Sequence, residues 1–224
     1  LKVFTTRSED VCRIMDGSTN AYLQEDRAIE DFLKTIEPNY NVALDKLIAG
    51  EIDNICIYTI AGFVAYVISC SPAGMRIGSG PLKSTVETTA AMMEPRGLLP
   101  PPPSQLGIAT LTELLRDGAV DVRIDPKYPQ AIGISSILEL TALFGNFKWE
   151  ILQNHFDASL FFTSDFPAAI EKTDDLRILN RIVPLAPYLA LRIKPDLTLD
   201  KDRLDCSFTH FGYRCRKVGR KELV

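Results

Sequence analysis

Three polar side chains in the last third of the chain have types and a spacing that suit a catalytic site. Ser164 and Asp165 belong to the segment Thr163–Pro167, and His155 lies about ten residues before Asp165. A histidine oriented by a carboxylate acts as a general base in hydrolases and nucleases. The segment is also typical of a turn, because Ser and Asp side chains bind nearby backbone groups. Asp165, Ser164 and His155 are therefore candidate catalytic residues, with a structural turn as the commoner role for such a segment.

A basic segment near the end of the sequence offers a second kind of chemistry. Arg214, Arg216 and Lys217 lie next to Phe211 and Tyr213. Cations of this kind pair with phosphates while neighbouring rings stack on bases, so RNA or DNA is a candidate partner. The formal net charge of −4 and the pI near 5.3 argue against binding of nucleic acid or anionic lipid by the whole surface. If the protein binds nucleic acid, we expect the contact at this segment alone. The simpler interpretation of the segment is a run of charged residues exposed to solvent.

Metal and cofactor chemistry has weaker support. Cys206, His210 and Cys215 are three zinc-type ligands close together in sequence, but no Cys-x-x-Cys pair accompanies them. Residues 78–85 lack the Gly-Lys pair of a phosphate loop, and Pro81 removes one N–H donor. We therefore expect no metal and no cofactor. The scattered cysteines favour reduced thiols, as in a cytoplasm, and a Cys206–Cys215 disulfide across a hairpin is the alternative.

Helices are expected to build the chain from about residue 25 to 157. From Glu25 to Ile48, apolar residues recur at spacings of three and four, which indicates one buried helical face. Pro38 interrupts that pattern, so we expect a kink or a break there, and Gly50 ends the segment. A second helix is predicted from about Asn54 to Ser69. It is apolar nearly all round and is the natural centre of the helical part.

The next stretch, from Pro72 to Ser104, is rich in glycine and proline and includes the run Pro100–Pro103. This composition disfavours continuous regular structure, so we expect a connector that contains at most a short helix over Leu82–Met93. The proline run favours a stiff extended segment or, less often, a ligand for an aromatic groove. Two further helices are predicted, one from about Leu106 to Gly118 and a long one from about Ile134 towards His155. An interruption of the second helix at Gly145-Asn146 is the alternative.

After Asp157 the residue pattern changes from helical to strand-like. Short bulky segments separated by turn signals occupy residues 158–163, 178–183, 188–193 and 206–213. The predicted fold class is therefore α+β, in which the helical first two thirds pack against a small antiparallel sheet built from residues 158–213. Because the last predicted helix leads directly into the first strand, we expect one domain over residues 1–224.

Three segments of the sequence, in their order and at their distances, resemble a known family. They are Ile29–Leu33 followed by Ile36-Glu37, then Trp149–Leu152 leading into Phe161–Pro167, then Pro184–Pro187. From about Ala28 to Lys221 the chain is similar to the mainly bacterial domain-of-unknown-function family numbered 4238. The resemblance implies a fold but no established activity. Family members begin with a His-x-x-Pro-Gln segment and end with a further helix, so it also implies that both pieces lie outside Leu1–Val224.

Two functional classes remain open. The absence of familiar catalytic signatures, together with the resemblance, favours a bacterial binding or effector module that acts through a partner in stress or in defence against phage. The alternative is a hydrolase or nuclease that uses Asp165, Ser164 and His155. The longest apolar stretch, Ile55 to Ile68, is shorter than the roughly 20 residues of a membrane-spanning helix, and no secretion signal is present. A soluble, cytoplasmic protein without membrane contact is therefore expected.

Overall fold

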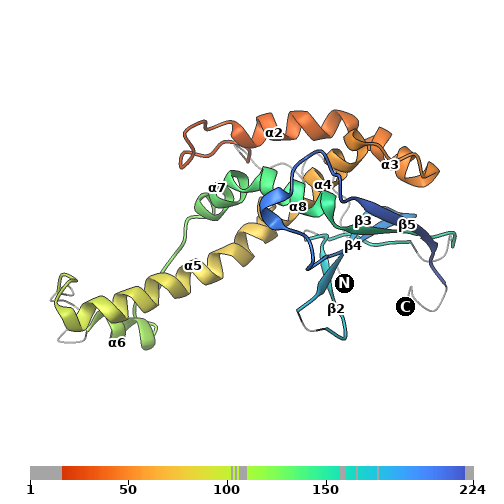
Figure 1. The fold of residues 1–224 in the computed structure, drawn as a ribbon. Helices are drawn as coiled ribbons and strands as arrows, with labels where there is room; N and C mark the ends of the chain where they lie inside the picture. The colour runs from red at the N-terminus through yellow and green to blue at the C-terminus, as the bar shows by residue number, and fades with distance from the viewer. Residues whose placement is uncertain are drawn as a thin grey trace, which may run out of the picture.

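The protein has an α+β fold in which a helical part precedes a five-stranded sheet (Figure 1). The structure, a computed structural model, describes residues 17–101, 103, 105, 110–156, 160–164, 166–175 and 177–219. One large hydrophobic cluster contains residues from α2, α3, α4 and α8 and from strands β1, β3 and β4. The predicted fold class is therefore confirmed, although several of the predicted boundaries are not.

The first helical segment breaks where its proline predicts. Helix α2 (Ala28–Ile36) gives way to the 3-10 turn η1 (Glu37–Asn39), which has Pro38 in its first turn, and α3 (Tyr40–Ala49) follows. Proline lacks the N–H that an uninterrupted helix needs at this point. Gly50 then ends α3 in the left-handed conformation (φ 76°), the region that glycine adopts without steric cost.

Helix α4 (Asn54–Ser69) is the centre of the helical part, as expected. It begins at Asp53, whose carboxylate accepts a hydrogen bond from the Cys56 N–H, and most of its residues are buried. Helix α8 (Ile137–Asn146) packs against it. Gly145 of α8 also faces Phe208, which precedes strand β5 (Gly212–Lys217). A Cβ at Gly145 would lie 2.2 Å from Phe208 Cε1, so a larger residue would collide with that ring.

The predicted connector after Pro72 is wrong, because residues 72–93 form one long helix, α5 (Pro72–Met93). Ser71 caps its start by accepting from the Gly74 N–H, and Pro72 occupies the first turn, where a missing N–H costs nothing. Pro81 lies inside the helix, and because proline has no N–H, the Ile77 carbonyl lacks its helical hydrogen-bond donor. Ile77 is exposed, so water can donate that hydrogen bond. Figure 1 shows α5 extending away from the rest of the protein.

A short helix, α6 (Leu111–Arg116), packs against α5. It follows the 3-10 turn η2 (Glu94–Arg96), whose Glu94 carboxylate accepts from the Leu111 and Thr112 N–H groups. Thr110 caps α6 in a reciprocal capping box with Glu113. The helix thus begins later than the predicted Leu106, and residues 106–109 lie outside the described residues.

The long helix predicted from Ile134 towards His155 does end at Asn146, where an interruption was the alternative, but its continuation to His155 is wrong. Helix α7 (Lys127–Ser135) ends at Ser136, α8 ends at Asn146, and strand β1 (Lys148–Gln153) follows. Four consecutive residues of β1 are buried, because helices cover one of its faces, while charged partners of Glu150 and an apolar cluster around Leu152 cover the other. A strand buried on both faces lacks the alternation of buried and exposed residues that identifies a strand in a sequence.

The sheet has the strand order β2-β3-β4-β1-β5. Its other strands are β2 (Ala169–Lys172), β3 (Leu179–Ala186), β4 (Leu189–Lys194) and β5 (Gly212–Lys217). Neighbouring strands are antiparallel except β1 and β5, which are parallel. The parallel pair corrects the expectation of a purely antiparallel sheet, and it arises because the chain crosses over through η4 (Lys201–Arg203) before β5.

Two of the four predicted strands correspond to β3 and β4, and two do not. The described residues 160–163 of the first predicted strand have no strand conformation, and its residues 158–159 lie outside the described residues. The last predicted strand, residues 206–213, is mostly turns, and β5 begins at Gly212. Within the described residues no single helix is long and apolar enough to cross a membrane. The helical segments 28–49 and 54–69 reach the necessary length and composition only when they are taken together, and the angle between them is 113°.

Candidate functional site

The structure describes two of the three predicted catalytic residues, Ser164 and His155. The Ser164 hydroxyl accepts from the Phe166 N–H (3.2 Å) and donates to the Phe166 carbonyl (2.9 Å), which closes a local turn. His155 is exposed, and no hydrogen bond of the described residues joins it to Ser164. Asp165 lies outside the described residues, so its role stays a prediction.

Two of the segments that carry the family resemblance lie side by side at the β3–β4 turn. The Phe161 N–H donates to the Pro187 carbonyl (2.9 Å), and the Asn154 N–H donates to the Tyr188 carbonyl (2.9 Å). From the helical part, the Tyr40 hydroxyl donates to the Leu185 carbonyl (3.1 Å), and burial raises the pKa of Tyr40 to about 12. Backbone and phenol groups make these contacts, so the arrangement holds the turn in place.

The predicted nucleic-acid residues lie on strand β5 and divide between the two faces of the sheet. Successive strand side chains point to opposite faces, so Arg214 and Arg216 share one face and Lys217 lies on the other. Arg214 is paired in register with Glu150 of β1, and its Nη2 lies 2.6 Å from Glu150 Oε1. Two of the three predicted cations thus lie on the sheet face that bears Glu150.

Glu150 is the centre of this sheet face, and it was not predicted as a site residue. Its side chain is fully buried, although it is a carboxylate in the middle of a strand. Arg192 Nη1 lies 2.5 Å and Lys194 Nζ 3.2 Å from Glu150 Oε2, both from the neighbouring strand β4. With Arg214 from the other side, three cations surround one buried carboxylate.

The ionic network continues on both sides of Glu150. Arg192 Nη2 also pairs with Glu171 Oε1 on β2 (2.9 Å), and the Asn180 amide donates to Glu171 (2.8 Å). At the other end, Lys148 Nζ lies 2.9 Å from Asp196 Oδ2. We call five side chains on this side of the sheet the cationic face: Lys148, Arg192, Lys194, Arg214 and Arg216. Among the described residues, Glu150, Glu171 and Asp196 are carboxylates that pair with members of this face.

Two of these carboxylates have strongly lowered pKa values. Burial alone raises the pKa of Glu150, but hydrogen bonds and charge from Arg192 and Lys194 outweigh burial and lower the pKa to about 2. Hydrogen bonds from Thr198 and Lys148 lower the pKa of Asp196 to about 2. Both groups are therefore ionised at neutral pH, and the network is a set of charged partners.

An open pocket of about 360 Å³ lies at one end of the cationic face. Its lining residues are Lys148, Trp149, Lys194, Gly212, Tyr213 and Arg214. Three of them carry positive charge, whereas Glu150 is buried beneath and has no exposed surface. Lys148 and Arg214 are well exposed, with 67% and 65% of their side-chain surface accessible. The pocket therefore presents cationic groups to solvent and has the chemistry of an anion site.

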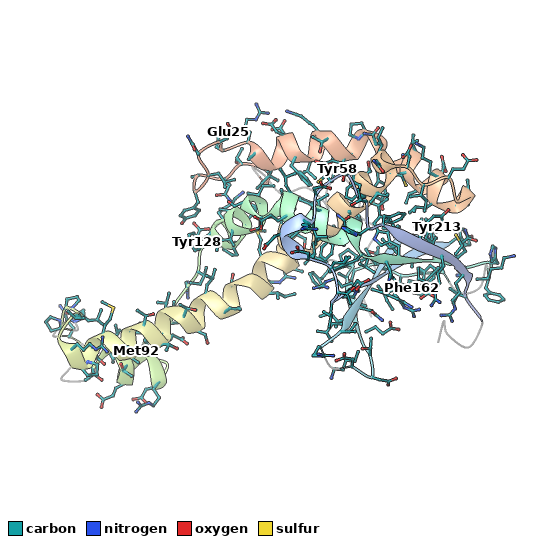
Figure 2. The ribbon with its side chains drawn as sticks, in the orientation of Figure 1. Glu25, Tyr58, Met92, Tyr128, Phe162 and Tyr213 are labelled. Atoms are coloured by element: carbon teal, nitrogen blue, oxygen red, sulfur yellow. The ribbon has the colours of Figure 1, made fainter. Side chains whose placement is uncertain are left out.

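Aromatic and apolar side chains occupy the other end of the same face. Phe161 packs with Leu152 and Ala190, which lie two residues along their strands from Glu150 and Arg192. The next residue, Phe162, is 87% exposed and lies beside the sheet (Figure 2). Exposed rings and rows of cations are two features by which proteins bind single-stranded nucleic acid, since bases stack on rings and phosphates pair with cations.

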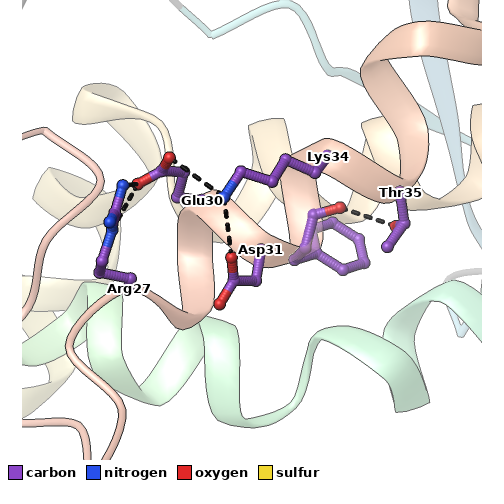
Figure 3. A network of polar contacts seen from close by, with 6 residues as sticks. Arg27, Glu30, Asp31, Lys34 and Thr35 are labelled. Atoms are coloured by element: carbon purple, nitrogen blue, oxygen red, sulfur yellow. Dashed lines mark hydrogen bonds and ion pairs between the residues drawn. The ribbon is translucent and has the colours of Figure 1, made fainter.

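The charges on helix α2 contrast with those of the cationic face. Figure 3 shows that Arg27 pairs with Glu30 (2.5 Å) and that Lys34 pairs with both Asp31 (3.1 Å) and Glu30 (3.2 Å). These ion pairs join residues three or four apart on one helix and are exposed, so they act as helix-stabilising contacts. Since the cations and carboxylates balance, α2 offers no net charge to a partner.

Metal ligation finds no support within the described residues, where no three His, Cys, Asp or Glu side chains are close enough to hold an ion. Cys206 and Cys215, the proposed zinc ligands or disulfide partners, are both exposed free thiols.

Comparison with known protein families, with curated proteins and with solved structures finds no match to this chain. The resemblance to the family numbered 4238 therefore stays a prediction.

Proposed function

We propose that this protein is a binding module for single-stranded nucleic acid and that the cationic face is its interface. The observation that carries the proposal is the pocket in which Lys148, Lys194 and Arg214 converge from three neighbouring strands over the buried carboxylate of Glu150. A binding module was the favoured expectation from the sequence, and this proposal names its ligand. Of the expected basic segment, the proposed interface keeps Arg214 and Arg216 and adds cations of β1 and β4. The bacterial effector role in stress or phage defence rests on the family resemblance alone.

Each part of the network has a distinct task in this proposal. Phosphates bind Lys148 and Arg214, whose side chains reach solvent, and the guanidinium fork of Arg214 suits a bidentate contact. Glu150 is ionised and buried, so it fixes Arg192, Lys194 and Arg214 in position without exposing negative charge to the ligand. Phe162 then provides the ring on which a base stacks.

The shape of the site favours a single strand over a duplex. Cations two residues apart on one strand are separated by about 7 Å along an open sheet surface. Sheets that bind RNA in this way lay the strand across their face and stack unpaired bases on aromatic side chains. Duplex DNA is recognised by an element inserted into a groove, whereas the cationic face is part of the sheet surface.

The test is fluorescence anisotropy with a labelled 12-nucleotide RNA of mixed sequence. The double variant Lys148→Gln/Arg214→Gln should bind about tenfold more weakly, because two charge-assisted contacts are lost. Glutamine at 214 keeps an N–H group for Glu150. The matched control is Lys34→Gln/Lys83→Gln, which removes two paired cations of α2 and α5 and should bind as the wild type does.

Two outcomes would count against the proposal. One is RNA binding by the Lys148→Gln/Arg214→Gln variant with wild-type affinity. The other is tighter binding of a 12-base-pair duplex than of the single strand. Circular dichroism of both variants establishes that they are folded, so that a loss of binding reports on the cationic face.

A further inference from the structure

Arg181 lies on the sheet face opposite the cationic face and has an unusual environment for an arginine. Because strand side chains alternate, the β3 residues Arg181 and Val183 point towards the helices, whereas Asn180 points towards the cationic face. The Arg181 guanidinium carbon lies over the ring of Phe144 in α8, 5.3 Å from its centroid. Arg181 is half-buried at the boundary of the helical layer.

No anion of the protein compensates this charge in the part of the chain that the structure describes. No carboxylate forms an ion pair with Arg181 there, and its recorded contact is the Phe144 ring. Burial lowers the pKa of Arg181, and no neighbouring charge opposes that effect. Arg192 on β4, in contrast, contacts two carboxylates. An external anion would give this half-buried guanidinium a charged partner that the described residues do not supply.

The surroundings of Arg181 combine exposed apolar surface with a second cation. Ile170 of the edge strand β2 is directly opposite Arg181 in the register, and Lys172 is opposite Leu179. These four side chains therefore share one face of the β2–β3 pair. Ile170 is 64% and Leu179 40% exposed, and Figure 1 shows β2 extending away from the helices. An anion bound here would have hydrocarbon surface beside it.

We infer that Arg181 binds the carboxylate of a small apolar molecule whose hydrocarbon part lies over Ile170 and Leu179. The Arg181 guanidinium carbon lies 5.3 Å from the centroid of the Phe144 ring, and a guanidinium has paired N–H groups that match the two oxygens of a carboxylate. The apolar part of the ligand covers the two exposed aliphatic side chains. This site is independent of the cationic face, because the two lie on opposite sides of the sheet.

The experiment is a titration of the ¹⁵N-labelled protein with octanoate, followed by amide chemical shifts, with 1-octanol as the uncharged comparison. Octanoate should shift the amides of Ile170, Leu179 and Arg181 in a saturable way, and octanol should bind about tenfold more weakly, since a charged hydrogen-bonded contact is lost. Arg181→Met keeps the length of the side chain without its charge, and it should lower octanoate affinity by a similar factor. Arg181→Lys should retain part of the affinity.

The control variant is Arg177→Met, which removes an exposed arginine of the same hairpin that is paired with Asp175. It should bind octanoate as the wild type does. Equal affinity for octanoate and octanol would overturn the inference, and this comparison needs no variant, so it holds even if Arg181→Met fails to fold. Octanoate binding that is unchanged in folded Arg181→Met, or shifts confined to other parts of the protein, would also overturn it.

Discussion

Glu150 is the residue on which most of the proposed site depends. It is a fully buried carboxylate that contacts Arg192, Lys194 and Arg214, which come from the strands on either side of its own. Burial of one such charge is tolerated only when it is paired, and loss of the partner leaves the remaining charges uncompensated. The same side chain therefore contributes to the stability of the sheet and to the position of the cations.

Glu150→Gln should destabilise the protein by about 3 kcal/mol, because the neutral amide cannot compensate three neighbouring cations. Urea denaturation followed by circular dichroism measures this change in the free energy of unfolding. The control is Glu87→Gln on α5, where the carboxylate is exposed and 3.8 Å from Lys83, and its unfolding midpoint should match that of the wild type. A Glu150→Gln midpoint equal to that of the control would contradict the role given to this carboxylate.

The pH dependence of stability follows from the lowered pKa of Glu150. The folded-state pKa of about 2 lies below the ordinary value of 4.5, so folding favours the ionised form. Its contribution is fully present above about pH 4.5 and is lost as the pH falls towards 2. The difference in unfolding free energy between wild type and Glu150→Gln should therefore shrink between pH 5 and pH 2, measured by urea titrations across that range. A difference that stays constant over this range would show that Glu150 is not the titrating group.

At the scale of single elements, helix α5 shows how local chemistry overrides composition. Its glycines and prolines predicted a connector, yet the Ser71 cap, Pro72 in the first turn and internal hydroxyl contacts accompany a continuous helix. The Thr85 hydroxyl donates to the Pro81 carbonyl (2.9 Å), and the Ser79 hydroxyl donates to the Met75 carbonyl (2.8 Å). The outer half of α5, where Met92 lies (Figure 2), is mostly exposed.

Two glycines of α5 should respond to alanine to different extents. A Cβ at Gly80 meets no atom within 4 Å apart from its chain neighbours, but Pro81 follows and disfavours helical geometry in a residue with a Cβ, so Gly80→Ala should change the stability by less than about 1 kcal/mol. A Cβ at Gly74 would lie 2.3 Å from the Ile68 carbonyl oxygen, so Gly74→Ala should destabilise it by about 1–3 kcal/mol. Thermal melts of the two variants make the comparison. Similar effects of the two substitutions would contradict the described packing of α5.

The elements that the sequence predicts well are those defined by local signals. Helices α2, α3 and α4 follow from apolar periodicity, from Pro38 and from Gly50. The sequence predicts helix where strand β1 lies. Both faces of β1 are buried because it pairs with β4 and β5, which are distant in sequence, so no local signal identifies the strand. Strand β2 has four residues, mostly exposed, and gives no pattern from which it could be predicted.

The candidate site was predictable in part for the same reason. Arg214 and Arg216 could be proposed because cations near aromatic residues are visible in the sequence. Glu150, Lys148 and Lys194 could not, because their convergence with Arg214 depends on the register of three strands. Lys217 is adjacent to Arg216 in sequence but lies on the opposite face, which the alternation of a strand explains once β5 is known.

At the scale of the whole molecule, the sheet separates two environments. One face contributes Trp149, Ile151 and Leu191 to the core shared with the helices. The other has the cationic face and the pocket of about 360 Å³. Five of the 25 Lys and Arg residues lie on this face, so the proposed contact with nucleic acid is local and is compatible with a net charge of −4.

The most direct test of this account is the salt dependence of RNA binding. Each phosphate neutralised on a single strand contributes a slope of about −0.7 to a plot of log affinity against log salt concentration. Phosphate contacts from Lys148 and Arg214 therefore predict a slope of about −1.4 for the wild type and a slope near zero for Lys148→Gln/Arg214→Gln. A wild-type slope near zero, or equal slopes for the two proteins, would contradict phosphate binding at the cationic face.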